Sequence, residues 1–424
     1  MRTVQYVAMR FYKIGLQERV IKCSNASGGR AGKLGAWAGI ALTVSNMVGT
    51  GAFTSLGYQV EGDASIFSVV MLWLLGGFTA FCGAVSYHSL IQLFPDSGGE
   101  TYFVARLYGR VPSIIVAVLS IVFGFAAPIA LSAVAFASYL LPVVGLQVKG
   151  VASLAIVLVS AVHLMRLRTR GAIQGWLSLG KILILLAFII GFFFVPKSLT
   201  VQPDPANINI EYFFTAPFAI ALVFVHYAYS GWNTSVYVFR ELKDTRTVYF
   251  SLFVSVVLIT LLYTALNAIF FLCVEKENLQ GVTEVGSMVA EVLFGSKWGH
   301  VLSSAIGILL IANVSAMIWA GSQVSQKTQE LVSSKLPSVG KPFLHLISLA
   351  TISLLFVWWY EFGQLLLITS CILSLISVSV VVRLVSLRNC KNEAVSITWK
   401  TKTCAIFYCV MMFSSSVTVL LTAL

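Results

Sequence analysis

The stretch VSNMVGTGAFTSLG, from Val44 to Gly57, interrupts the first long apolar segment of the chain with Gly49, Thr50 and Gly51. Glycine weakens a helix, and lipid cannot satisfy the backbone groups that are then left unpaired. Such a break in a membrane helix is therefore tolerated only where protein or a water-filled cavity covers it. A bound solute would supply the missing partners; the alternative is close helix packing through small residues.

The composition places this stretch in a membrane protein. Of the 424 residues, 58% are hydrophobic and 10% are charged, which is far from the balance of a soluble globular chain. Apolar runs of about 18 to 25 residues recur, long enough to cross a bilayer as helices, and they lack a β-barrel's alternation. We therefore predict an all-α polytopic membrane protein with about eleven transmembrane helices. They fall at residues 36–60, 66–92, 112–141, 149–165, 172–195, 213–238, 249–273, 299–325, 343–359, 362–385 and 404–424.

The basic residues predict how these spans are oriented. The net charge is +12, and with the N-terminus in the cytoplasm 23 of the 28 basic residues fall on cytoplasmic segments. Only Lys149, Lys197, Lys276 and Lys297 fall outside, an asymmetry typical of membrane insertion. Membrane orientation therefore explains the positive net charge, and we expect no nucleic acid partner. We expect a multi-pass protein of the plasma membrane, and the short termini favour the cytoplasmic (inner) membrane of a bacterium over a eukaryotic plasma membrane.

A second interruption lies about 180 residues further along the chain. It falls in VHYAYSGWNTSVYVFREL, Val225 to Leu242, where Ser230, Gly231 and Asn233 lie at mid-membrane depth in the predicted sixth span. One break alone is compatible with helix packing. Two breaks in corresponding spans favour a shared binding site.

Each broken span opens a group of five, which predicts an inverted repeat with a binding site at the membrane midplane. The repeats cover residues 36–195 and 213–385, within a membrane core of residues 36–390. Residues 1–35 form a basic cytoplasmic N-terminal segment, and residues 391–424 form a cytoplasmic loop and the last span.

Three motifs resemble those of a known transporter family. SNMVGTGAF (Ser45 to Phe53) resembles the first-helix signature of amino acid-polyamine-organocation (APC) permeases, and FPDSGGETYFVARLYG (Phe94 to Gly109) resembles the loop after their second helix. YAYSGWNTSVYVFRELKDTRT (Tyr227 to Thr247) is similar to their sixth helix. The resemblance implies the LeuT-type fold of two inverted five-helix repeats. The family usually adds two further helices, whereas only one fits here.

The two breaks suit the two charged groups of an amino acid. Backbone N–H groups freed at residues 49–51 lie at the positive end of a half-helix and would bind the carboxylate, together with the Thr50 hydroxyl. Carbonyl groups near Tyr227, Ala228 and Ser230 would accept from the ammonium group. The predicted substrate-binding residues are Asn46, Gly49, Thr50, Gly51, Tyr227, Ala228, Ser230, Gly231 and Trp232.

Some of these roles have open alternatives. The resemblance implies that Tyr227 is an aromatic gate over the substrate and that Asn46 lies near it, whereas a plain packing role is the alternative for Tyr227. Trp232 is either a packing residue or a wall of the pocket. We expect Asn233 to brace the broken helix.

Lys181 and Ser322 are the predicted coupling residues. A lysine inside a span costs about 2.5 to 3.5 kcal/mol on insertion scales, so it should face a cavity or polar partners. The resemblance implies that it replaces the sodium ion of sodium-coupled relatives and bridges the first helix near Gly49 to the eighth, through Ser322 or Asn313. The alternative is a lysine that reaches to the cytoplasmic interface.

Other chemistry finds no support in the sequence. No Gly-x-x-x-x-Gly-Lys-Ser/Thr motif for nucleotide phosphates occurs, and the 7 cysteines lack metal-ligand spacing. No paired carboxylates or activated nucleophile occupies a plausible site. We therefore expect no enzyme, no cofactor and no metal.

These observations predict a secondary active transporter that moves amino acids across the lipid bilayer by alternating access. It would be sodium-independent, coupled to protons or working by exchange, and a monomer or homodimer. A neutral substrate is favoured because the pocket helices carry no carboxylate for a cationic side chain. The alternatives are a cationic amino acid or polyamine antiporter on the same fold and an amino acid sensor that does not transport.

Overall fold

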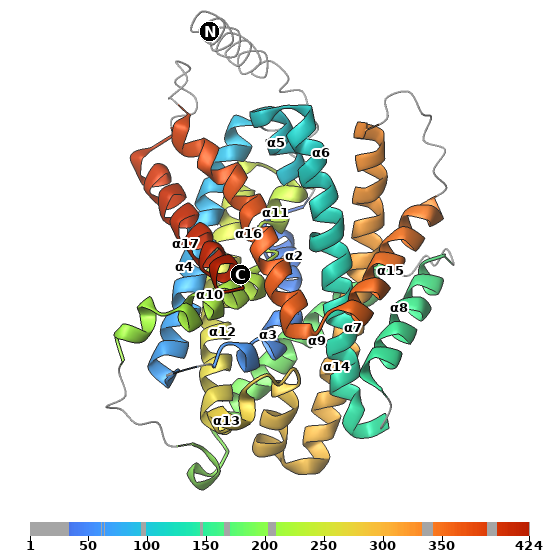
Figure 1. Ribbon diagram of the computed structural model, residues 1–424, viewed down its shortest axis with the longest axis vertical. Coiled ribbons are helices and arrows are strands. Elements are labelled where there is room, and N and C mark those ends of the chain that lie inside the picture. Colours follow the sequence, from blue (N-terminus) through green and yellow to red (C-terminus); the bar gives the residue numbers. More distant parts are fainter. Residues whose placement is uncertain are drawn as a thin grey trace, which may run out of the picture.

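The computed structural model describes residues 34–60, 62, 64–94, 99–144, 147–164, 170–201, 209–332, 342–387 and 397–423. Within these ranges all regular elements are helices, and one isolated backbone bridge is present. Most of the long helices run along the long axis of the molecule (Figure 1). The chain is thus an all-α polytopic membrane protein, as predicted. The basic segment 1–35 lies outside the described residues except for its last two positions.

The helices follow the order of the predicted spans. The first five spans correspond to α2 (Ala36–Met47) with α3 (Thr50–Thr54), α4 (Ile66–Leu93), α6 (Arg110–Leu119) with η2 (Ser120–Ala126) and α7 (Ala127–Val144), α8 (Val148–Leu164), and α9 (Arg170–Phe192). The other six correspond to α10 (Ala216–Tyr229) with α11 (Thr234–Tyr237), α12 (Thr245–Cys273), α14 (Val285–Val332), α15 (Pro342–Trp359), α16 (Phe362–Ser386) and α17 (Trp399–Ala423). Between them lie η1 (Leu56–Tyr58), α5 (Glu100–Tyr108), η3 (Lys197–Leu199), η4 (Glu211–Phe214), η5 (Phe239–Glu241) and α13 (Lys276–Leu279).

Length and hydropathy support a membrane location for this bundle. Six of the described helices are long and apolar enough to cross a membrane, and shorter apolar helices lie at four further predicted spans. The broken pair α2 and α3 occupies the remaining one. The division into two inverted repeats stays a prediction.

The eighth span differs from its predicted bounds. Helix α14 begins at Val285, well before the predicted start at residue 299, and it turns at Gly295, where φ is 75°. Glycine suits this positive φ because it has no Cβ atom. Residues 285–294 therefore form an arm that packs back on the spanning part of α14.

A short backbone pairing joins the approach to the first span with the end of the sixth. Leu34 and Leu242 form a parallel bridge. The Leu34 N–H donates to the Glu241 carbonyl at 3.0 Å, and the Lys243 N–H donates to the Leu34 carbonyl at 3.1 Å. The two broken spans are therefore tied together at this end.

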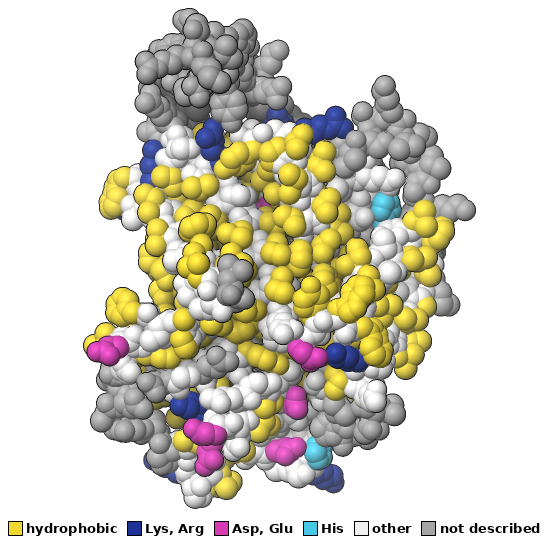
Figure 2. Space-filling model, viewed as in Figure 1, with side chains coloured by type: hydrophobic (Ala, Val, Ile, Leu, Met, Phe, Trp, Pro, Cys, Tyr) yellow, Lys and Arg dark blue, Asp and Glu magenta, His cyan; other side chains and the backbone are white. Residues whose placement is uncertain are grey.

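The surface agrees with a bilayer-embedded bundle. Figure 2 shows a broad band of apolar side chains around the middle of the visible face. Lys and Arg side chains lie toward both ends of this face, whereas most Asp and Glu side chains on it lie toward the end away from α5 and α6 (Figures 1 and 2). An apolar band of this kind is what contact with lipid tails requires.

Candidate functional site

The two broken spans touch at their breaks. Helix α2 ends at Met47, Val48 and Gly49 leave the helical conformation, and α3 begins at Thr50. A Cβ atom built on Gly51 would lie 2.6 Å from the Ala228 Cα atom of α10. Since real Cβ atoms do not approach backbone this closely, the contact requires glycine at position 51. The structure thus brings the predicted residues of the two breaks together.

The second break is shaped by Gly231 and Asn46. Helix α10 ends at Tyr229, and Gly231 has a φ of 97°. A Cβ atom on Gly231 would lie 2.8 Å from the Asn46 Nδ2 atom. The Asn46 amide donates to the Thr234 Oγ1 atom at 2.7 Å and remains exposed. The Asn46 amide therefore lies at an accessible surface beside the two breaks.

Thr50 belongs to a cluster of three hydroxyl groups. Its Oγ1 atom lies 2.8 Å from the Oγ atom of Ser132 on α7, and both side chains are buried. The Tyr227 hydroxyl also lies within hydrogen-bonding reach of the Thr50 side chain. The predicted residues Thr50 and Tyr227 are therefore neighbours, which leaves both the gate and the packing role of Tyr227 open. Ser132 was not predicted, although a serine in the apolar third span is a detectable signal.

Lys181 is buried in the centre of the bundle, with 3% of its surface exposed. Its Nζ atom donates to the Asn313 Oδ1 atom of α14 at 2.5 Å and to the Ser45 carbonyl of α2 at 3.3 Å. A Cβ atom on Gly49 would lie 3.0 Å from the Asn313 amide nitrogen. Lys181 therefore links the fifth, first and eighth spans beside the first break. It does not extend to the membrane interface.

Of the two partners proposed for Lys181 in the eighth span, Asn313 makes the contact and Ser322 does not. The Ser322 hydroxyl donates to the Trp319 carbonyl of its own helix at 2.8 Å. The nine residues between Asn313 and Ser322 correspond to about 13.5 Å along a helix, at 1.5 Å per residue. Ser322 consequently lies too far along α14 to reach the Lys181 side chain. The predicted contact with Ser322 is therefore wrong, and Asn313 is the partner of Lys181 on this helix.

Trp232 packs inside the bundle. It is 6% exposed, and its ring meets the Tyr87 ring edge-on with centroids 4.9 Å apart. A second edge-on contact joins it to Tyr408 of α17. A Cβ atom on Gly83 of α4 would lie 2.8 Å from the indole. Of the two roles left open for Trp232, the structure favours packing.

Asn233 binds a carboxylate that was not predicted. Its Nδ2 atom donates to the Glu100 Oε1 atom at 2.6 Å, and the Tyr87 hydroxyl donates to the same oxygen at 2.9 Å. Glu100 begins α5, outside the candidate spans, and is 8% exposed. Burial raises the pKa of its carboxyl above the ordinary value, although hydrogen bonds partly offset this. Asn233 thus braces the second break, as expected, by binding to the start of α5.

A comparison with protein families identifies the architecture around these breaks. A model of the family described as amino acid permeases matches residues 34–423, which include every described helix. The chain belongs to the amino acid permease family.

Individual relatives of this permease are distant. It is 24% identical over 296 residues to the Asc-type amino acid transporter 1 of Mus musculus, covering 67% of this chain and 55% of that protein. It is 24% identical over 297 residues to the human Large neutral amino acids transporter small subunit 2, with the same two shares. The human b(0,+)-type amino acid transporter 1 is 25% identical over 293 residues, covering 66% of this chain and 60% of that protein. The matched part of the permease therefore spans little more than half the length of these relatives.

Tyr139 connects the second half of the first span to the arm of α14. Its hydroxyl donates to the Phe53 carbonyl at 2.9 Å and accepts from the Gly286 N–H at 2.9 Å. The Ser303 hydroxyl donates to the Tyr139 carbonyl at 3.0 Å. Tyr139 is fully buried. In this permease the Tyr139 hydroxyl therefore links α3 to the arm 285–294.

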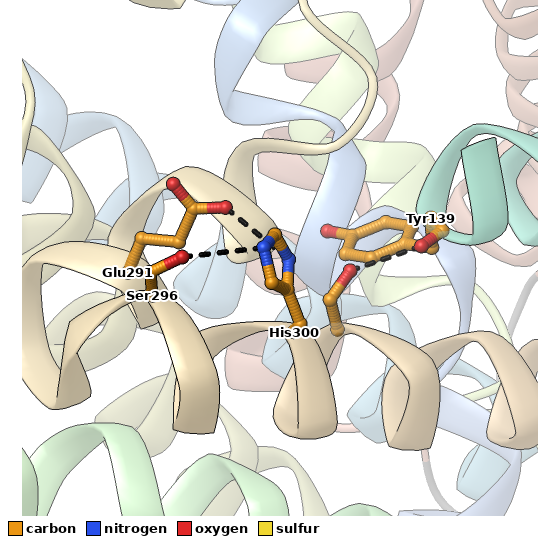
Figure 3. A network of polar contacts seen from close by, with 5 residues as sticks. Tyr139, Glu291, Ser296 and His300 are labelled. Carbon is orange, nitrogen blue, oxygen red and sulfur yellow. Dashed lines mark hydrogen bonds and ion pairs between the residues drawn. The ribbon is translucent and has the colours of Figure 1, made fainter. Parts of the chain in front are cut away.

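The arm is held against the spanning part of α14 near its turn (Figure 3). The His300 Nδ1 atom lies 3.6 Å from the Glu291 Oε1 atom, and its Nε2 atom lies 3.3 Å from the Ser296 Oγ atom. A Cβ atom on Gly299 would lie 2.8 Å from the Glu291 Cα atom. These contacts fix the fold-back that presents Gly286 to Tyr139. Among the residues that the structure describes, no three His, Cys, Asp or Glu side chains lie together as metal ligands would.

Proposed function

We propose that this permease is a secondary active transporter of amino acids, with the substrate bound between the two breaks. The observation that carries the proposal is the contact of Gly51 with Ala228 beside the exposed amide of Asn46. This contact joins two interrupted backbones beside an exposed amide, which supports a substrate site between the breaks. A site of this kind at the midplane is typical of alternating-access transporters.

The chemistry of the two breaks supports binding of a free amino acid. The first N–H groups of α3 have no acceptor within that helix, because a helix leaves its leading donors unpaired. They and the Thr50 hydroxyl bind the substrate carboxylate. The last carbonyls of α10, from Tyr227 to Ser230, accept hydrogen bonds from the substrate ammonium. Gly231 and Asn46 line the same space.

Lys181 supports sodium independence. Its ammonium group occupies the space between Ser45 of the first span and Asn313 of the eighth. A fixed positive charge there performs the bridging role of a bound cation and repels sodium. Uptake is then driven by protons or by exchange against an internal amino acid.

A neutral amino acid is the proposed substrate class. The two breaks themselves contain no carboxylate, and the Glu100 carboxyl beside the second break is already bound by Asn233 and Tyr87. A cationic side chain would therefore have no free counter-charge there. The name of the relative called Large neutral amino acids transporter agrees with this class. A cationic amino acid or polyamine antiporter is the second candidate, since the b(0,+)-type relative is also a match.

The proposed setting is the plasma membrane, as a multi-pass protein with a cytoplasmic N-terminus. The excess of Lys and Arg on the predicted cytoplasmic segments of the sequence supports this orientation. The cell membrane of a bacterium and a monomeric or homodimeric state remain part of the proposal. Enzymatic activity is not part of it, because the family is one of transporters.

The experiment is uptake of radiolabelled amino acids into liposomes that contain the purified protein. Uptake is measured with and without an inward proton gradient, and with and without internal amino acid. Lys181→Ala and Thr50→Val are measured alongside the wild type, with Lys297→Ala as a control that removes an exposed lysine near the Gly295 turn. We expect saturable uptake of neutral amino acids that the first two variants lower and the control retains.

The outcomes separate the candidate functions. Uptake that follows the proton gradient means symport, and uptake that needs internal amino acid means exchange. Uptake confined to arginine, lysine or polyamines would favour the cationic antiporter. Substrate binding without flux under all conditions would refute the transporter and favour a sensor.

A further inference from the structure

Glu100 is a buried carboxyl group that accepts a hydrogen bond from its own backbone N–H, and its two side-chain partners both bind the same oxygen. The Oε1 atom accepts hydrogen bonds from Asn233 at 2.6 Å and from Tyr87 at 2.9 Å. No hydrogen bond to the Oε2 atom is formed by the side chains that the structure describes. A proton on Oε2 is therefore compatible with both existing bonds, because a protonated carboxyl still accepts through its carbonyl oxygen.

The groups around Glu100 are neutral. Tyr87 faces it from α4, Tyr408 faces it from α17, and Asn233 faces it from the sixth span. No Lys, Arg or His of the described residues forms an ion pair with it. A buried carboxylate without a cationic partner is costly, so the neutral acid is favoured while the site is closed to water.

The start of α5 is joined directly to the second break. Asn233 follows the Gly231 turn, and Glu100 is the first residue of α5. Beside it, Gly99 has a φ of 86°, and its Cα atom lies against the Tyr237 ring so closely that a side chain would overlap the ring. A movement of the residues after the second break therefore changes the surroundings of the Glu100 carboxyl.

We propose that Glu100 is a proton-binding site of the transport cycle, which holds the second break through Asn233 when protonated and releases its proton to water when the break moves. This inference rests on the proposed function and makes the proton the coupling ion. On release, the Oε2–H bond breaks, the proton passes to a water molecule, and the carboxylate keeps the electron pair. Lys181 then supplies a fixed charge between spans, and Glu100 supplies the exchangeable proton.

The test compares Glu100→Gln with the wild type in proteoliposomes. Glutamine keeps an oxygen that can accept from Asn233 and Tyr87 but cannot bind a proton. Glu241→Gln is the matched control, since Glu241 is an exposed carboxylate that follows the same break. Each variant is assayed for gradient-driven uptake and for exchange against internal amino acid without a gradient. We expect Glu100→Gln to keep exchange and to lose the stimulation by the proton gradient, whereas Glu241→Gln keeps both.

A second measurement, infrared spectroscopy, starts from the wild-type protein, so its main result does not depend on the folding of a variant. Infrared spectra of the wild-type protein are recorded across pH, and a protonated-carboxyl stretching band that shifts in heavy water is expected at neutral pH. This band should be missing from Glu100→Gln and present in Glu100→Asp, which keeps an acid at the position.

Three results would overturn the inference. One is gradient-driven uptake by Glu100→Gln equal to that of the wild type. Another is a wild-type protein that exchanges amino acids at a rate that a proton gradient does not alter. That result would overturn the role of Glu100 but leave the proposed transport function intact. The third is the lack of a neutral carboxyl band in the wild type. Absence of both uptake and exchange in the wild type would instead refute the proposed function on which the inference rests.

Discussion

Gly51 lies directly against the backbone of Ala228, with no side chain between the first and sixth spans at this point. Two segments more than 170 residues apart in sequence meet here beside the candidate site. Because packed interiors tolerate little added volume, position 51 is sensitive to any side chain.

Gly51→Val should abolish transport. A branched side chain there would overlap the Ala228 Cα and Cβ atoms, which lie 2.6 and 2.8 Å from an ideal Cβ position, and it would force the two breaks apart. The matched control is Gly150→Ala on α8, where nothing lies within 4 Å of an added Cβ. Initial rates of amino acid uptake into liposomes measure the effect. Normal uptake by Gly51→Val would contradict the contact.

Asn313→Leu should lower transport as strongly as Lys181→Ala, because it removes the side-chain acceptor of the Lys181 ammonium. The two substitutions should not be additive, since each breaks the same link. Ser322→Ala should have little effect, because that hydroxyl donates to its own helix. Uptake rates of the single and double variants form the test, and a Ser322→Ala defect equal to that of Asn313→Leu would show that the assignment is wrong.

Thr50→Val should raise the KM for uptake. The substitution removes a hydroxyl proposed to bind the substrate carboxylate and leaves the buried Ser132 hydroxyl without this partner. Loss of such a bond costs about 1 to 3 kcal/mol, and about 1.4 kcal/mol corresponds to a tenfold change in affinity. Ser132→Ala, which spares the Thr50 hydroxyl, should raise KM less. Concentration series of uptake by both variants measure this, and an unchanged KM in Thr50→Val argues against a role in binding.

Tyr139→Phe should destabilise the fold by about 1 to 3 kcal/mol, because the Phe53 carbonyl and the Gly286 N–H both lose a buried partner. The control is Tyr360→Phe, which removes a hydroxyl from a partly exposed ring. Thermal unfolding of the detergent-solubilised variants compares them. Equal midpoints for the two variants would mean that the Tyr139 hydroxyl contributes nothing to stability.

Asp244 should stabilise the start of α12 in a pH-dependent manner. Hydrogen bonds from the Thr247 hydroxyl and N–H hold the pKa of the Asp244 carboxyl below its ordinary value of 3.8. Because the folded-state pKa is the lower one, the stabilisation is present above pH 3.8 and is lost as the pH falls through the folded-state value. Asp244→Ala should therefore lower the unfolding midpoint at neutral pH, by an amount that shrinks below pH 3.8. A difference that stays constant on acidification would contradict this.

Features that depend on a short stretch of chain were predicted from the sequence. The breaks lie next to Gly49 and Gly231. Glycine weakens a helix whatever the helix packs against, so this effect can be read from the sequence. The existence of the spans followed from the length of apolar runs, a local property as well. The early start of α14 was missed because the arm before Gly295 is less apolar than a span.

Contacts between distant segments were predicted less well. Ser322 was the predicted coupling residue and Asn313 only an alternative partner of Lys181, because the depth and rotation of α14 decide the partner and cannot be read from the sequence. Ser132 was missed because the third span was judged by its apolar average. Glu100 was missed because its helix lies outside the spans, and only the folded chain brings it to the second break.

The backbone pairing of Leu34 with residues 241–243 has a mechanical consequence. Two hydrogen bonds couple the stretch that leads into α2 to the stretch that leaves η5. Neither half-helix can swing alone without breaking them. A displacement of α2 would therefore either break this pairing or carry the chain beyond the second break with it.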